Sequence, residues 1–307
     1  MKTYKGARLL AFFLLLAMIM PQACAVQVDD LSLPQVLSYH GILCLVNRDR
    51  KVTKKYVPPD LVVPKVALNK KGREDAIMLR AEAARALEAL FEAALQEEHT
   101  LLAASGYRSF GIQDLLFQAK VKEVGTKQKA WRTVSPPGAS EHQLGLAMDV
   151  QSPTVPRLNR AFGESPEGIW LAQNAHRFGF IIRYKQEWRE VTGYRYEPWH
   201  IRYIGISHAS AIYELDIPYE TYYPALLNIP EYILLQGTDV LLKNLVRDVL
   251  DGKEIPETLR VATPEDQVET LESATKAYLS TQETYVQAVA RCFPAWLQIE
   301  DRDELAE

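Results

Sequence analysis

Three helices are predicted in the first two thirds of the chain. In residues 73–98 apolar residues recur at helical spacing, which predicts a long amphipathic helix packed on a sheet. A second helix is predicted from about residue 109 to residue 124, with Gly125 in the position of a helix stop. Residues 166–178 predict a third helix, which ends at Gly179.

Short apolar runs bounded by polar residues or glycine predict strands between these helices. Helices and strands are mixed without a regular β-α-β alternation. The sequence therefore predicts an α+β fold, in which a small and mostly antiparallel sheet is flanked by helices. The strands are expected at residues 42–46, 101–104, 146–150, 180–184 and 200–204, and an extended proline-bearing segment at residues 56–64.

The pattern changes after about residue 226. Residues 234–250 have helical spacing, Gly252 interrupts it, and a further helix is predicted from about Thr263 to Cys292. We therefore predict a main catalytic domain with an N-terminal segment over residues 26–225 and a helical C-terminal extension over residues 226–307. The extension carries no recognisable chemistry, so it is expected either to pack on the main domain or to bind a partner.

The amino terminus has the features of a secretory signal peptide. Three basic residues precede the apolar run 9–20, and Ala23 and Ala25 are the small residues that a signal peptidase reads. We expect residues 1–25 to be removed and the protein to be periplasmic or otherwise secreted to the cell envelope. The apolar run is shorter than the roughly 20 residues that span a bilayer, so no permanent membrane anchor is expected.

The net charge and the cysteines bear on two questions, whether the protein binds nucleic acid and whether it contains a disulfide. The formal net charge of the whole chain is −4, and removal of three basic residues with the signal peptide makes it −7, which argues against nucleic acid as a partner. Cys44 and Cys292 would then be the remaining cysteines. In an oxidising compartment they either form a disulfide or remain two buried, unconnected thiols.

Candidate catalytic chemistry lies in residues 140–149 and 197–200. Two imidazoles, one carboxylate that can bind a metal ion and one further carboxylate are what a catalytic zinc site needs. Asp149 lies on a predicted buried strand, where a bare carboxylate is costly unless it is paired or bound to a metal. The other histidines, His40, His99, His176 and His208, are expected to be surface residues or hydrogen-bonded core residues.

Glu197 and His200 do not form the helical pair of an H-E-x-x-H motif, because Pro198 would lie inside that helix. A turn entering a strand is the more natural structure. Glu197 would then lie near the metal-bound water as a general base. The alternative is a structural ion pair between Glu197 and Arg195 or Arg202.

The pattern Ser140-x-His142-x-x-Gly145-x-Ala147-x-Asp149, followed by Glu197-x-x-His200, resembles that of the LAS metallopeptidases. The surroundings are similar to the VanY-type D-alanyl-D-alanine carboxypeptidase branch of that family. These surroundings include the segments at residues 105–110, 136–142, 178–184 and 192–200, and the similarity runs from about residue 45 to residue 212.

The resemblance implies a catalytic metal site and a substrate. It implies Zn²⁺ held by His142, Asp149 and His200, with Glu197 as the catalytic base. By the same resemblance Arg108 faces the substrate and stabilises the oxyanion or holds a carboxylate, and Gln113 and Ser140 are substrate-side residues. The implied substrate is the peptidoglycan stem peptide, from which the terminal D-alanine is removed.

Three alternatives remain open from the sequence. Close relatives with the same metal motif act as L,D-carboxypeptidases on tetrapeptide stems. A peptidoglycan endopeptidase would need only a more open cleft. A wall-binding module without catalysis is the alternative of a different class, and the complete set of ligands and base argues against it.

Overall fold

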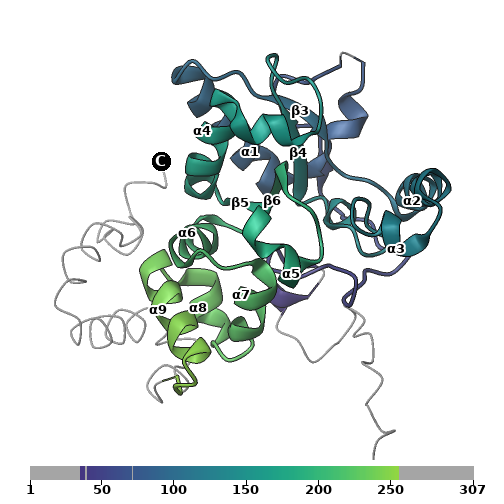
Figure 1. Ribbon diagram of the computed structural model, residues 1–307. Helices are drawn as coiled ribbons and strands as arrows, with labels where there is room; N and C mark the ends of the chain where they lie inside the picture. The colour runs from purple at the N-terminus through teal and green to yellow at the C-terminus, as the bar shows by residue number, and fades with distance from the viewer. Residues whose placement is uncertain (1–34, 39, 71, 256–307) are drawn as a thin grey trace, which may run out of the picture.

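The computed structural model describes residues 35–38, 40–70 and 72–255 (Figure 1). The predicted signal peptide, the predicted helix after Thr263 and Cys292 lie outside these residues. No helix in the described part of the chain has both the length and the apolar character needed to cross a bilayer.

A four-stranded sheet lies at the centre of the fold, in the order β3-β4-β6-β5, with every neighbouring pair antiparallel (Figure 1). A two-stranded antiparallel ribbon of β1 and β2 lies apart from it. The predicted α+β class with a small antiparallel sheet is therefore confirmed. The strands are β1 (Leu61–Val62), β2 (Leu79–Arg80), β3 (Leu102–Ser105), β4 (Ala147–Gln151), β5 (Phe180–Tyr184) and β6 (Glu197–Tyr203).

Helices surround the sheet, and short 3₁₀ turns join several elements. The α-helices are α1 (Ala81–Gln96), α2 (Phe110–Val124), α3 (Lys127–Ala130), α4 (Pro166–Asn174), α5 (Arg189–Thr192), α6 (Ile206–Leu215), α7 (Tyr219–Leu226), α8 (Glu231–Gln236) and α9 (Asp239–Leu250). The 3₁₀ turns are η1 (Gln35–Leu37), η2 (Glu74–Ile77), η3 (Glu141–Leu144), η4 (Arg160–Glu164), η5 (Ala175–Phe178) and η6 (Gln186–Trp188).

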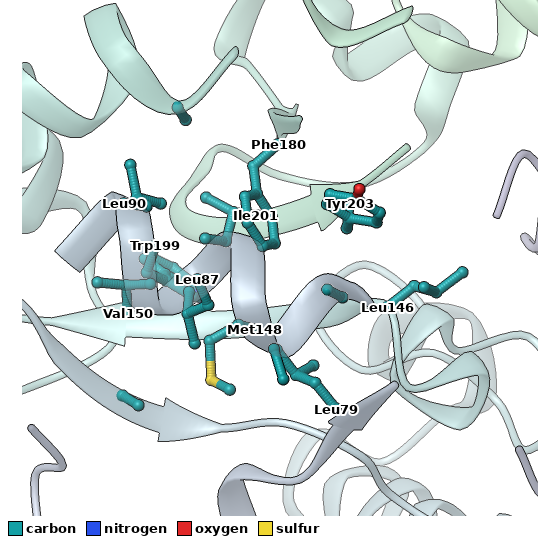
Figure 2. Packing of buried hydrophobic residues seen from close by; sticks show 14 of the residues in the cluster. Leu79, Leu87, Leu90, Leu146, Met148, Val150, Phe180, Trp199, Ile201 and Tyr203 are labelled. Atoms are coloured by element: carbon teal, nitrogen blue, oxygen red, sulfur yellow. The ribbon is translucent and has the colours of Figure 1, made fainter. Parts of the chain in front are cut away.

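One face of the sheet packs on α1 and α4 to form the main apolar core (Figure 2). Alternation along a strand places every second side chain on this face. On β4 these are Met148 and Val150, and on β6 they are Trp199 and Ile201, which lie against Leu87 of α1. The intervening residues of β4 and β6, Asp149 and His200 among them, therefore lie on the opposite face.

The opposite face carries a second apolar cluster at its β5 side. Ile181 of β5, the segment around Leu43 and the helices α6 to α9 supply it. These four helices lie together below the sheet in Figure 1. Helix α6 lies before residue 226 and α7 ends at it, and both share this core with α8 and α9. The predicted domain boundary at that residue stays a prediction.

The predicted helix over residues 73–98 and the predicted strand over residues 42–46 differ in the structure. The predicted helix over residues 73–98 is divided into η2, β2 and α1, because Tyr107 donates a backbone hydrogen bond to Met78 and β2 pairs with β1. Residues 42–46 form no strand. The Arg202 guanidinium donates to the carbonyls of Ile42 and Cys44, which satisfies these acceptors without a strand partner.

The helix ends agree closely with the sequence signals. Ser109 caps α2 by accepting from the Ile112 backbone N–H, and Gly125 ends the helix in the left-handed conformation at φ 85°. The predicted third helix is present as α4 followed by η5, and Gly179 ends it at φ 82°. The predicted helix over residues 234–250 is instead α8 and α9, separated at Gly237.

Candidate metal centre

The centre of the site is set by the pairing of β4 with β6. Asp149 and His200 are directly opposite each other in this antiparallel pair, so their side chains emerge side by side on the same face. His142 lies on η3, just before β4. Gly145, at φ 65°, ends η3 and lets the chain turn sharply into the strand.

Three side chains bring their donor atoms together here. His200 Nδ1 lies 3.0 Å from Asp149 Oδ1, and His142 Nε2 lies 3.4 Å from Asp149 Oδ2. One nitrogen of each histidine and one carboxylate oxygen all lie within 4.8 Å of one another. All three residues are buried, which favours a specific ligand for the carboxylate over simple exposure to water.

Hydrogen bonds on the far side of each ring select its tautomer. His142 Nδ1 lies 2.7 Å from the carbonyl oxygen of Gly106, so it carries the proton and leaves Nε2 free to bind a metal. His200 Nε2 lies 3.2 Å from Glu141 Oε2, so it donates there and leaves Nδ1 free. Both free nitrogens point toward Asp149.

This arrangement fits a catalytic zinc ion. Two imidazole nitrogens and one carboxylate oxygen are ligands that zinc prefers, and each imidazole has the outer hydrogen-bond acceptor that metal-bound histidines usually have. Three protein ligands leave a coordination position for water or substrate. The donor set formed by His142, Asp149 and His200 therefore suits Zn²⁺.

Glu197 lies at the start of β6, opposite Tyr184, where the pairing with β5 is irregular. Its carboxylate is buried, and this burial raises its pKa to about 7. The Arg195 guanidinium lies 3.7 Å away and is half exposed, which makes it a weakly held ion-pair partner. Arg202 contacts Glu141 instead, so the alternative ion pair of Glu197 with Arg202 is absent.

Arg108 follows β3 and extends toward the metal ligands. One guanidinium nitrogen donates to Ser105 Oγ at 2.8 Å and lies 3.5 Å from Asp149 Oδ2. Its Nε donates to Gln113 Oε1 at 3.1 Å, and Gln113 in turn donates to the carbonyl of Ser135. Arg108 is thus held in a fixed orientation while part of its side chain stays accessible.

A cavity of about 400 Å³ joins these groups. All seven candidate residues identified in the sequence line it. Tyr184 and Tyr194 add aromatic walls, and Leu116 of α2 lies at its side. The candidate residues are Arg108, Gln113, Ser140, His142, Asp149, Glu197 and His200.

Several residues around the metal ligands were missed in the sequence. Glu141 accepts from His200 and pairs with two fully buried arginines, Arg183 and Arg202. Burial alone would raise the pKa of Glu141, but the two arginines hold it well below its usual range. A charged residue inside an apolar strand, such as Arg183 in residues 180–184, is the sequence signal that could have indicated this network.

Comparison with known proteins identifies the family. The family model described as "VanY: D-alanyl-D-alanine carboxypeptidase" matches residues 76–206. The chain is 42% identical over 184 residues to YodJ of Bacillus subtilis (strain 168), whose name describes it as a carboxypeptidase. The matched region is 60% of this chain and 67% of that protein. The chain belongs to the VanY family.

Two further relatives agree with this VanY assignment. A D-alanyl-D-alanine carboxypeptidase of Enterococcus faecium is 35% identical over 190 residues, which span 60% of this chain and 58% of that protein. The chain thus spans less than two thirds of that relative. The solved structure of the LdcB LD-carboxypeptidase has 41% identity and a TM-score of 0.58, and the match covers 61% of this chain and 87% of LdcB. This VanY-family chain is accordingly a metallocarboxypeptidase, a hydrolase.

Proposed function

We propose that this protein removes the terminal D-alanine from peptidoglycan stem peptides that end in D-Ala-D-Ala. The observation that carries the proposal is the convergence of His142, Asp149 and His200 on one point beside the buried carboxylate of Glu197, in a single cavity. The name of the matched family and that of the E. faecium relative support this substrate.

His142, Asp149 and His200 would hold the zinc ion. When bound, zinc polarises a carbonyl oxygen and lowers the pKa of a bound water toward about 7. Glu197 takes the proton of the attacking water and passes it to the departing amine of D-alanine. Its buried carboxylate suits this role, because burial raises its pKa above the ordinary value and so makes it a stronger base.

Arg108 supplies positive charge on the substrate side of the cavity. Its hydrogen bonds to Ser105 and Gln113 fix the direction of the guanidinium before substrate arrives. An oriented donor of this kind stabilises charge that develops on the carbonyl oxygen, or holds the terminal carboxylate. We assign Gln113 and Ser140 to the substrate side of the same cavity.

The second candidate is an L,D-carboxypeptidase that acts on tetrapeptide stems. The likeness to the LdcB LD-carboxypeptidase, with 41% identity and a TM-score of 0.58, favours it. The metal ligands and the base would serve both reactions equally well. The difference lies in how the cavity accepts the residue before the cleaved bond, which product analysis determines directly.

The test is release of free D-alanine by the zinc-loaded protein from a pentapeptide stem and, separately, from a tetrapeptide stem. Release from the pentapeptide that chelator abolishes supports the D,D activity. Release from the tetrapeptide alone transfers the assignment to the L,D activity. Glu197→Gln should retain zinc and lose about 10²- to 10⁴-fold in kcat, as expected for a lost general base.

We also propose that the protein acts in the cell envelope after removal of residues 1–25, since its substrate lies outside the cytoplasmic membrane. Sequencing the amino terminus of the protein recovered from an envelope fraction tests the cleavage. Cys44, which is buried, and Cys292 would either form a disulfide there or remain two unconnected thiols. Titration of two thiols in the denatured, unreduced protein would contradict that pairing.

A further inference from the structure

A chain of buried charged side chains runs from helix α7 to a metal ligand. Glu220 on α7 contacts Arg183 on β5, Arg183 contacts Glu141 on η3, and Glu141 contacts His200 on β6. Glu220 lies outside the segment matched by the VanY family model, which ends at residue 206. The metal site is thus connected to a part of the protein beyond that segment.

The contacts in this chain are short, and Arg183 uses all three of its guanidinium nitrogens in them. The two terminal nitrogens of Arg183 donate to the two carboxylate oxygens of Glu220, at 2.8 and 2.6 Å. Arg183 Nε donates to Glu141 Oε1 at 2.8 Å. The other oxygen of Glu141 accepts from His200 Nε2 at 3.2 Å. A bidentate guanidinium–carboxylate pair fixes orientation as well as position.

Burial makes this chain of contacts sensitive to the loss of any member. The side chains of Arg183 and Glu141 are fully buried, and that of Glu220 is 12% exposed. A buried charge that loses its partner is strongly unfavourable, so neighbouring groups rearrange to regain one. Arg183 without Glu220 would be drawn more strongly to Glu141, which is the group that holds the His200 ring.

Arg202 supports Glu141 from a second direction. It donates to Glu141 Oε1 at 3.1 Å and to the backbone carbonyl of Cys44 at 2.7 Å. Glu141 Oε1 is therefore held by two arginines, whereas Oε2 is the oxygen that accepts from His200. The contact between His200 and Glu141 Oε2 therefore depends on how the two arginines orient the Glu141 carboxylate.

We propose that Glu141 and Glu220 are positioning residues for zinc binding: Glu141 orients the His200 ring, and Glu220 on α7 holds Arg183 so that Glu141 keeps its place. The proposal rests on the metal site of the proposed function. It assigns to α7 a part in zinc affinity, beyond packing on the catalytic core.

The expected effects decrease with distance from the metal. Glu141→Gln keeps the shape of the side chain but removes its charge and should weaken zinc binding by about 10- to 100-fold, the usual range for such outer contacts. Glu220→Gln should weaken it less, toward the lower end of about 10-fold. Glu220→Asp keeps the charge and should recover part of the loss.

The matched control is Asp216→Asn. Asp216 forms an ion pair with Lys185 at 2.6 Å, so it also joins the end of β5 to the helices that follow β6, at the end of α6. It has no contact with Arg183 or Glu141 among the described interactions, and asparagine tolerates its left-handed backbone at φ 50°. General loosening of the packing of α6 and α7 would affect this variant and Glu220→Gln alike.

The experiment measures zinc dissociation constants of the full chain by competition with a chromophoric chelator, together with the visible spectrum of the Co²⁺-substituted protein. We expect weaker zinc binding and an altered Co²⁺ spectrum for Glu141→Gln and Glu220→Gln, and unchanged values for Asp216→Asn. Zinc affinity equal to wild type in Glu220→Gln, or an equal loss in Asp216→Asn, would overturn the proposal.

This readout separates the two proposals. Wild-type protein that binds zinc but releases no D-alanine would contradict the proposed function and leave the zinc affinities to decide the positioning role. Unfolding in urea identifies a variant that fails to fold. In that case Glu220→Asp, which preserves the ion pair with a shorter side chain, gives the deciding affinity.

Discussion

Lowering the pH should destabilise the packing of helices α6, α7 and α8 through one buried histidine. His208 on α6 lies between α7 and α8, with Nε2 2.7 Å from the carbonyl oxygen of Leu234 and Nδ1 2.9 Å from the hydroxyl of Tyr222. A neutral imidazole satisfies both contacts, because Nε2–H donates to the carbonyl and Nδ1 accepts from the hydroxyl. Burial lowers the pKa of His208 to about 4, although the Leu234 carbonyl opposes this.

The direction of the effect follows from the lower pKa in the folded state. An unfolded histidine titrates near pH 6.5, so below this pH the unfolded chain takes up a proton that folded His208 does not. The contribution to stability is therefore complete above about pH 6.5 and is lost as the pH falls toward 4. Between about pH 7.5 and pH 5 this linkage lowers the free energy of unfolding by about 2 kcal/mol.

Urea unfolding of wild type and His208→Gln at both pH values provides the assay. Glutamine can donate to the Leu234 carbonyl and does not titrate, so the variant should lose about 2 kcal/mol less than wild type on acidification. His142 also has a pKa lowered to about 4 by burial, and since both proteins contain it, its effect cancels in the comparison. The same pH dependence in both proteins would refute the reasoning.

Further predictions concern the apolar core, the cap of α2 and the turn before β4. Leu87→Ala removes a fully buried side chain of α1 and should lower the free energy of unfolding by about 2 to 5 kcal/mol in urea; a loss below about 1 kcal/mol would contradict the packing. Ser109→Ala removes the cap of α2 and should cost about 1 kcal/mol, whereas Ser109→Asp, which also caps, should not. Gly145→Ala forces a side chain into a left-handed position with its Cβ 2.8 Å from Leu61, and should lower the thermal midpoint by the equivalent of about 1 to 2 kcal/mol; an unchanged midpoint would exclude this strain.

The closeness of His142 to Asp149 was predictable because its signals are local in the sequence. His142, Gly145 and Asp149 lie within one short segment, and alternation along the following strand determines which side of it Asp149 occupies. Strand β5 and the ends of α2 and α4 were also readable, since glycine and serine mark them. These features depend on neighbours a few residues away.

The contacts that support the site were not predictable in the same way. Arg183 and Glu220 are 37 residues apart, and no periodicity connects a strand residue with a helix residue at that distance. The predicted strand at residues 42–46 failed for a similar reason, because Arg202, from a strand far along the chain, takes the carbonyls of Ile42 and Cys44. Tertiary hydrogen bonds override local pattern in both cases.

The most direct test of the account is the zinc content of the purified full chain, measured by mass spectrometry of the metal for wild type and for Asp149→Asn. The account predicts about one zinc ion per wild-type chain, the stoichiometry of a catalytic site with three protein ligands, and a large loss of zinc in the variant. Zinc-free wild type, or a variant that holds zinc as tightly as wild type does, would contradict the assignment of His142, Asp149 and His200 as the metal site.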